Sequence, residues 1–117
     1  MGKLTTHVLD TAQGRPAAGL QIELWRLDGD ERRLVATVQT NADGRTDAPL
    51  LADQALSAGT YEIIFAVGNY FAQQPIPTST PPFLDQVPVR FAIADADAHY
   101  HVPLLVSPWA YSTYRGS

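Results

Sequence analysis

The sequence contains no cysteine, and this absence removes several classes of site at once. Disulfide bonds, thiolate nucleophiles and sulfur-ligated metal centres are all excluded. Positive charge is scarce too: 8 lysines and arginines stand against 12 aspartates and glutamates, which gives a net charge of −4 without any basic stretch. Because neutralising phosphates requires clustered lysine and arginine, no nucleic acid is expected as the main partner.

Long apolar runs are also missing. No segment reaches the roughly 20 apolar residues that cross a bilayer, and the first seven residues hold no apolar core of signal-peptide length. The sequence does not end in the peroxisomal tripeptide Ser-Lys-Leu. We therefore expect no membrane partner and a cytoplasmic location.

The composition is that of a folded protein with a core of its own. Apolar residues make up 45% of the 117 residues and charged residues 17%, which argues against disorder. A chain of this length buries about two thirds of the surface that its unfolded form exposes. We expect one domain, residues 1–117.

The dominant pattern is alternation of apolar and polar residues in short runs between turn residues, which is typical of strands. The clearest alternating sets are Leu20, Ile22 and Leu24; Leu34, Ala36 and Val38; Tyr61, Ile63, Phe65 and Val67; and Val87, Val89, Phe91 and Ile93. Seven or eight strands at this spacing predict an antiparallel sandwich or barrel. One stretch departs from the pattern: residues 69–74 predict a short helix with a cap at Asn69 and a stop at Pro75, followed by a proline-rich loop over residues 75–82.

The end of the sequence predicts a final strand and not a frayed terminus. Residues 102–106 are apolar, residues 107–110 supply a turn, and residues 111–114 are rich in β-prone side chains. Pairing of the last two strands would bring Tyr114, Arg115 and the terminal carboxylate beside residues 99–101. Pro103 cannot donate to a ladder, so it is expected at an edge, at a bulge, or where the neighbouring strand ends.

The three histidines are His7, His99 and His101, and each lies on a predicted strand. Alternation places His99 and His101 on one face of their strand and Tyr100, with the apolar residues after it, on the better core face. Outward histidines are ordinary solvated residues on this evidence. A zinc site is not expected, because no carboxylate or thiol is clearly placed beside the two.

Other polar residues stay open to two interpretations. Arg45 follows the turn at residues 41–44 and is either a charged residue leaving that turn or a fork of donors for a planar imide or carboxylate. Asp10 and Asp47 either orient a histidine or, as turn aspartates usually do, bond to nearby backbone. No nucleophile elbow, phosphate loop or dinucleotide fingerprint occurs. The residues alone predict a sandwich with a set of His, Arg and Tyr side chains.

Three segments in order resemble the transthyretin superfamily. They are residues 4–11 (LTTHVLDT) with residues 14–19, residues 40–45 (TNADGR), and residues 99–108 (HYHVPLLVSP) with residues 111–117. The closing tetrapeptide, Tyr114 to Ser117, resembles the mark of the 5-hydroxyisourate hydrolases, as opposed to the hormone-carrying transthyretins. The resemblance runs nearly end to end.

This resemblance implies an all-β fold, an antiparallel β-sandwich of two four-stranded sheets with one short helix, assembled as a homotetramer. Sheet faces would meet across the tetramer centre to form a channel with a pocket at each end. Carried onto this sequence, the catalytic residues are His7, Arg45 and His101, and the substrate-binding residues are His7, Arg45, Tyr114 and Ser117.

The activity that the resemblance implies is hydrolytic opening of the six-membered ring of 5-hydroxyisourate, a product of urate oxidation. A histidine can move protons between water and the leaving nitrogen, and no cofactor or metal is expected for this reaction. Gly116 is expected to leave room for a flat ligand, on one face with Ser112 and Tyr114. The alternative from another class is a non-catalytic carrier of an aromatic small molecule in the tetramer channel.

Overall fold

The structure is a computed structural model that describes residues 1–116. It consists of nine strands, one short α-helix and one turn of 3-10 helix at Asp53–Ala55. The strands are β1 (Lys3–Asp10), β2 (Arg15–Pro16), β3 (Gln21–Asp28), β4 (Glu31–Gln39), β5 (Leu51–Ala52), β6 (Gly59–Ala66), β7 (Gln86–Ile93), β8 (His99–Val106) and β9 (Tyr111–Thr113), and the helix is α1 (Val67–Ala72).

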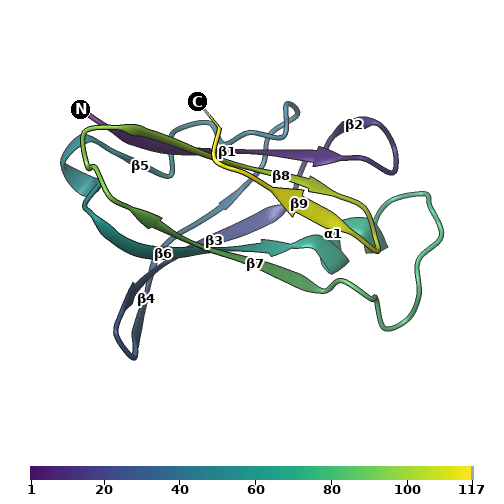
Figure 1. Cartoon of the computed structure of the whole chain (residues 1–117). Coiled ribbons are helices and arrows are strands. Elements are labelled where there is room, and N and C mark those ends of the chain that lie inside the picture. Colours follow the sequence, from purple (N-terminus) through teal and green to yellow (C-terminus); the bar gives the residue numbers. More distant parts are fainter. Residues whose placement is uncertain (117) are drawn as a thin grey trace.

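Two sheets lie face to face, as Figure 1 shows, and the predicted two-sheet sandwich is confirmed. One sheet has the order β4-β3-β6-β7. The other has the order β2-β1-β8-β9, with the short β5 also pairing with β1. The strand pairs are antiparallel with one exception, since β1 and β8 run parallel from Lys3 opposite His99 to Asp10 opposite Val106. This parallel pair joins the beginning and the end of the sequence.

The core lies between the sheets and follows from alternation along each strand. In β1 the buried side chains are Leu4, Thr6, Val8 and Asp10, and in β8 they include Tyr100, Val102, Leu104 and Val106. Facing strands β3, β6 and β7 contribute large buried residues such as Ile22, Phe65 and Ile93, respectively. The intervening residues of β1 and β8 therefore point to the outer face of their sheet. That outer face carries the histidines.

The helix begins earlier than the sequence predicts. It starts at Val67, directly after β6, and no side chain caps its first turn, so the cap expected at Asn69 is wrong. Packing explains the difference: Val67, Gly68, Tyr70 and Phe71 are buried, and the nitrogen of Gly68 donates to the carbonyl oxygen of Asp85 at 2.8 Å. The helix ends before Pro75, as expected, because proline disfavours helical backbone in the residue before it.

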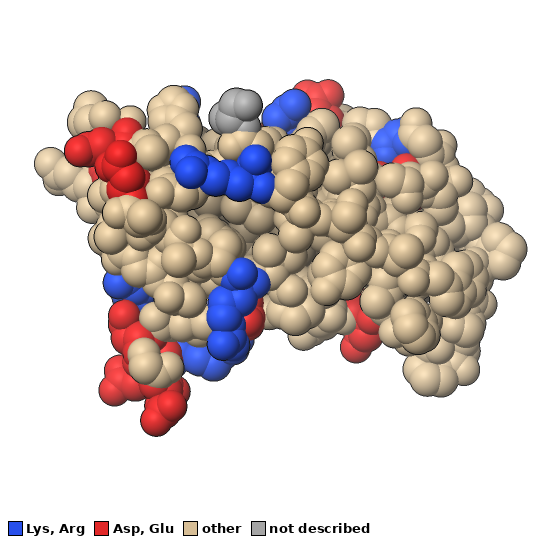
Figure 2. All heavy atoms as spheres, in the orientation of Figure 1, with Lys and Arg blue, Asp and Glu red and all other residues tan. Residues whose placement is uncertain are grey.

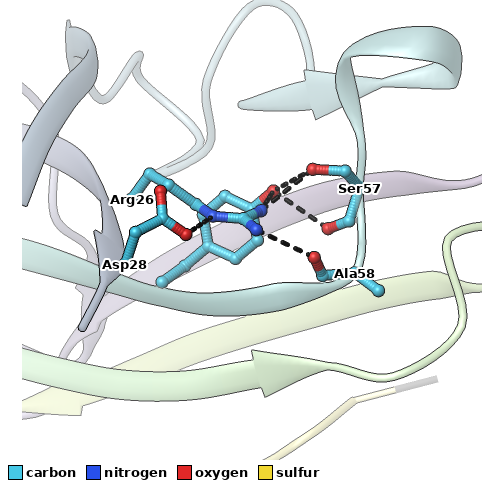
Figure 3. Close-up of polar contacts among 5 residues, drawn as sticks. Arg26, Asp28, Ser57 and Ala58 are labelled. Carbon is cyan, nitrogen blue, oxygen red and sulfur yellow. Dashed lines mark hydrogen bonds and ion pairs between the residues drawn. The ribbon is translucent and has the colours of Figure 1, made fainter.

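Arg26 fastens β3 to the start of β6 (Figure 3), and it lies opposite the buried Tyr61 on the core-facing side of the β4-β3-β6-β7 sheet. Its guanidinium donates to Ser57 Oγ at 2.9 Å, to Tyr61 Oη at 2.8 Å and to the carbonyl oxygen of Ala58 at 3.0 Å. Gly59 makes this approach possible, since a Cβ there would lie 2.3 Å from Arg26 Nη2 and the backbone φ is +143°. These contacts therefore stabilise the sheet that does not carry the histidines.

Candidate functional site

The candidate site is built on the outer face of the sheet that contains β1 and β8. The parallel register places Thr5 opposite His101 and His7 opposite Pro103. Thr5, His7 and His101 are all half-buried and lie on the face turned away from the core. The pairing of the first strand with the penultimate one thus brings together two histidines that are 94 residues apart in the sequence.

His101 is held on two opposite edges of its ring. On one edge, His101 Nδ1 and Thr5 Oγ1 are hydrogen-bonded at 2.9 Å. On the other edge lies Gly116, whose nitrogen donates to the carbonyl oxygen of His101 at 2.7 Å. A Cβ at Gly116 would meet His101 Cδ2 at 2.7 Å. The space that the sequence assigns to a flat ligand is therefore filled by the imidazole of His101 itself, which corrects that expectation.

Arg45 and His7 lie close enough to His101 to affect its protonation. The pKa of His101 is lowered from its ordinary value, first by burial of the ring and then by the positive charges of Arg45 and His7. Burial and like charge both disfavour the imidazolium form. His101 is thus neutral around pH 7, the state that a general base requires.

Arg45 is positioned by a tight turn against β1. Asn41 Oδ1 accepts from the nitrogens of Asp43 at 2.9 Å and Arg45 at 3.2 Å. Gly44 has a φ of +74°, which favours glycine, and a Cβ there would lie 3.3 Å from the ring of His7. The turn therefore sets Arg45 beside His7.

A hollow lies next to this turn. Its volume is about 180 Å³, and it is lined by Lys3, Thr5, Thr6, Arg45, Thr46, Asp47, Ala48 and Pro49. The Arg45 side chain is exposed, so its donors are accessible from this hollow. Two cations against one carboxylate make its lining positive on balance, which suits a ligand rich in carbonyl oxygens.

Pro103 explains how the tail reaches His101. The pairing of β9 with β8 stops at Leu104, opposite Thr113, and the hydroxyl of Thr113 donates to the carbonyl oxygen of Pro103 at 2.7 Å. Since proline has no N–H, the ladder cannot continue there. The chain bulges outward and returns at Gly116, opposite His101. Of the three positions expected for Pro103, at an edge, at a bulge or where the neighbouring strand ends, the structure shows the third.

The bulge places Tyr114 and Arg115 away from the hollow beside Arg45. The Arg115 guanidinium lies 4.1 Å from the ring centroid of Tyr100 and donates to the carbonyl oxygen of His99 at 3.2 Å. Tyr114 and Arg115 line a hollow of about 330 Å³ at the open edge between β7 and β9, where Figure 2 shows positive side chains on both sides. Within one chain, Tyr114 lies outside the hollow beside Arg45. Ser117, the remaining expected site residue, lies outside the described residues.

The alternation expected for residues 112, 114 and 116 does not hold, because the last strand ends at Thr113. Asp10 follows the turn interpretation, because its Oδ1 accepts from the backbone nitrogen of Gln13 at 2.9 Å. Asp47 differs from it, since its Oδ1 accepts from the side-chain Nδ2 of Asn41 at 3.0 Å. Neither orients a histidine by a hydrogen bond within residues 1–116. In the same part of the chain, no three His, Asp or Glu side chains gather as a metal site.

Thr5 is the residue that sequence reasoning missed. Its signal was available, because Thr5 stands two positions before His7 and alternation puts the two on one face of the first strand. Sequence spacing could not show that β1 pairs with β8, which is what places Thr5 opposite His101.

Comparison with known proteins identifies the family. The model of the HIUase/Transthyretin family matches residues 4–116, almost the whole sequence. The chain belongs to this family. Within residues 1–116, none of the helices has both the length and the apolar character that crossing a bilayer requires.

The relatives include enzymes at high identity. The 5-hydroxyisourate hydrolase 2 of Rhizobium meliloti is 60% identical over 116 residues, which cover 99% of this chain and 97% of the relative. The structure of Klebsiella pneumoniae 5-hydroxyisourate hydrolase superposes with a TM-score of 0.81 at 35% identity, covering both chains fully. The transthyretin of Sparus aurata superposes with a TM-score of 0.85 at 28% identity, covering 97% of this chain and 96% of that one. The fold is common to both groups, whereas sequence identity is higher to the hydrolases.

Proposed function

We propose that this protein is a 5-hydroxyisourate hydrolase, which opens the six-membered ring of its substrate to 2-oxo-4-hydroxy-4-carboxy-5-ureidoimidazoline in urate degradation. The observation that carries the proposal is the meeting of His7, Arg45 and His101 on the outer face of the β1–β8 pair, with the pKa of His101 lowered by burial and then by its two neighbours. Hydrolase relatives at 60% and 61% identity over nearly the full length of this chain support it.

The proposed reaction begins with attack of water on the ring carbonyl carbon. His101 takes the proton from the attacking water as its oxygen bonds to that carbon. The guanidinium of Arg45 holds the substrate oxygens and stabilises the negative charge that develops on the carbonyl oxygen. Collapse of the intermediate breaks the ring C–N bond, and the same histidine returns its proton to the leaving nitrogen.

His7 is assigned to positioning water or substrate. Its proximity to His101 also permits the reverse division of labour, in which His7 is the base. A lowered pKa for His101 favours the first assignment, because the base must be neutral at the working pH. No cofactor enters the proposal, because hydrolysis of an activated cyclic amide requires a placed water and a proton shuttle.

We further propose the homotetramer that the family resemblance implies. In such an assembly, residues that lie apart in one chain, such as Tyr114, could reach a site shared between subunits. Tyr114 and Ser117 therefore remain proposed substrate-binding residues. The cytoplasmic location likewise remains a prediction of the sequence.

The carrier function is less well supported. A carrier of aromatic molecules favours an apolar lining, and the hollow beside Arg45 has polar and charged walls. The transthyretin of Sparus aurata is also less similar in sequence, at 28% identity against 35% for the Klebsiella pneumoniae hydrolase and 60% for that of Rhizobium meliloti.

The decisive experiment is turnover of 5-hydroxyisourate generated in situ by urate oxidase. We expect the purified protein to accelerate the loss of the 5-hydroxyisourate absorbance above its spontaneous decay. A decay rate that stays at the spontaneous value over a range of protein concentrations would eliminate the enzyme and leave the carrier.

A further inference from the structure

We infer that Thr5 sets the tautomer of His101: the Thr5 hydroxyl accepts the Nδ1–H of the imidazole and so leaves the Nε2 lone pair free to take a proton. The direction of this hydrogen bond and the role assigned to the lone pair rest on the proposed hydrolase function, whereas the contact between Thr5 and His101 does not. Thr5 is a positioning residue in this account, because it acts on His101 and not on the substrate.

The contact is fixed by backbone pairing and not by chance contact of long side chains. Thr5 and His101 are opposite each other in the parallel register of β1 and β8, and both side chains leave the sheet on the same face. Thr5 Oγ1 and His101 Nδ1 are 2.9 Å apart. Among residues 1–116, the Thr5 hydroxyl has no other hydrogen-bond partner. A β-branched side chain is stiff at χ1, so the oxygen stays where the strand places it.

The opposite edge of the ring is closed by the tail. A Cβ on Gly116 would lie 2.7 Å from Cδ2 and 3.2 Å from Cγ of His101, so the backbone passes directly against that edge. Nδ1 and Cδ2 are on opposite edges of an imidazole. The ring is therefore clamped between Thr5 and Gly116, and Nε2 lies on the edge that points away from the strand. No hydrogen bond from residues 1–116 reaches Nε2.

The direction of the hydrogen bond follows from what a proton shuttle must do. If Nδ1 donates to Thr5, the bond is present in the neutral ring and also in the imidazolium, because Nδ1 carries hydrogen in both. If the hydroxyl donated to Nδ1, the bond would have to reverse each time the ring gained a proton. The first arrangement lets the ring cycle without rearrangement.

A neutral partner also suits the local electrostatics. A carboxylate on Nδ1 would stabilise the imidazolium and raise the pKa of His101. A hydroxyl orients the ring without adding charge, which leaves burial and the neighbouring Arg45 and His7 to keep the pKa of His101 low. Thr5 thus fixes the orientation and the tautomer of the His101 ring, whereas burial and the groups around His101 set its protonation state.

The first test reads the tautomer directly. Protein labelled with nitrogen-15 histidine is studied by proton–nitrogen correlation spectroscopy at a pH above the His101 pKa, with His101→Asn used to assign the signals. We expect Nδ1 of His101 to be protonated and Nε2 unprotonated in the unmodified protein. The opposite tautomer in the unmodified protein would overturn the inference without any variant being made.

The second test compares Thr5→Val, which keeps the shape and removes the hydroxyl, with Thr5→Ser, which keeps the hydroxyl. In Thr5→Val we expect a mixture of both tautomers and a kcat lowered roughly tenfold, with KM changed less than about twofold. Thr5→Ser should keep the original tautomer and most of kcat. Thr37→Val, on the exposed face of β4, is the matched control and should leave both readouts unchanged.

The outcomes separate this inference from the proposed function. Absence of turnover in the unmodified protein refutes the hydrolase, and the spectra still decide whether Thr5 sets the tautomer. An unchanged tautomer in Thr5→Val overturns the inference even if the enzyme is active. A loss of kcat that Thr5→Ser fails to restore also overturns it, because packing and not the hydroxyl would then be responsible.

Discussion

Gly116 packs its backbone against the imidazole of His101 so closely that a Cβ would lie 2.7 Å from Cδ2. The two residues are also joined by a hydrogen bond of 2.7 Å from the nitrogen of Gly116 to the carbonyl oxygen of His101. The end of the chain is thereby locked onto the strand that carries the proposed base. Placement of His101 depends on a glycine 15 residues later in the sequence.

The variant Gly116→Ala should move either the tail or the ring of His101. Its φ lies outside the left-handed region, so alanine adds no backbone strain and the effect comes from the contact alone. We expect roughly a tenfold or greater loss of kcat with a melting temperature close to that of the unmodified protein. Ser112→Ala, an exposed change in β9, is the control. Full activity in Gly116→Ala would mean that the clamp is irrelevant to turnover.

Replacing a proposed catalytic group should lower the rate much further. His101→Asn removes the proton shuttle, and Arg45→Ala removes the donors for the developing oxyanion. Each should reduce kcat/KM by roughly 10²-fold or more in the turnover assay. Arg33→Ala, in the exposed part of β4, controls for the loss of one positive charge. Rates that remain unchanged in both site variants would refute the role assignment and leave the fold intact.

The pH dependence has a definite sign. Because the pKa of His101 is lowered, its neutral form persists below the ordinary value of about 6.5, and kcat/KM should hold its plateau into mildly acidic solution before falling. Arg45→Gln removes a positive neighbour and should raise the pKa of His101, as measured by proton NMR titration of its ring. His7→Asn should raise it by less, since Arg45 has the larger effect. A downward shift in either variant would contradict the electrostatic account.

Removal of residues 114–117 tests the contribution of the tail. The deleted segment includes Gly116 and the proposed binding residue Tyr114, whereas β9 ends at Thr113 and keeps its pairing with β8. We expect a folded protein, judged by circular dichroism and thermal melting, with little or no turnover. A truncated protein that is fully active would show that the site has been assigned to the wrong region.

The buried pair of Asp10 and Tyr70 should govern stability at alkaline pH. Tyr70 donates to Asp10 Oδ2 at 2.8 Å, and burial together with this hydrogen bond raises the pKa of Tyr70 to about 12. The unfolded phenol ionises near its ordinary value of about 10, so the stabilisation is complete below that pH and is lost as pH rises toward 12.

Tyr70→Phe removes this hydrogen bond to a charged group and should lower the free energy of unfolding at neutral pH by about 1.5–3 kcal/mol. Urea unfolding measured at neutral and alkaline pH provides the readout. The variant should also lose the part of the alkaline destabilisation that comes from this phenol. Equal pH dependence in both proteins would argue against a perturbed Tyr70.

Much of the architecture can be predicted from the amino-acid sequence. Alternation in residues 20–24 and 87–93 predicts strands, and the structure confirms which of their faces is buried. The prediction works because successive side chains of a strand point to opposite faces, so that every second residue enters the core. The helix start predicted at Asn69 is wrong, because the helix begins at Val67 and the packing of Val67 and Gly68, not a cap, defines its first turn. The outward direction of His101 was predicted correctly, yet alternation alone treated it as an ordinary surface histidine.

Residue order specifies the sandwich and the faces of its strands, because periodicity and turn chemistry are local properties. The three motifs separately carry the resemblance to the family. Three features depend on how the strands assemble. The parallel register of β1 and β8 sets Thr5 against His101, the pairing of β8 with β9 breaks at Pro103, and Gly116 returns to the other edge of the His101 ring. The pairing of β1 with β8 joins residues 96 positions apart, and no local pattern specifies which strand a given strand will pair with.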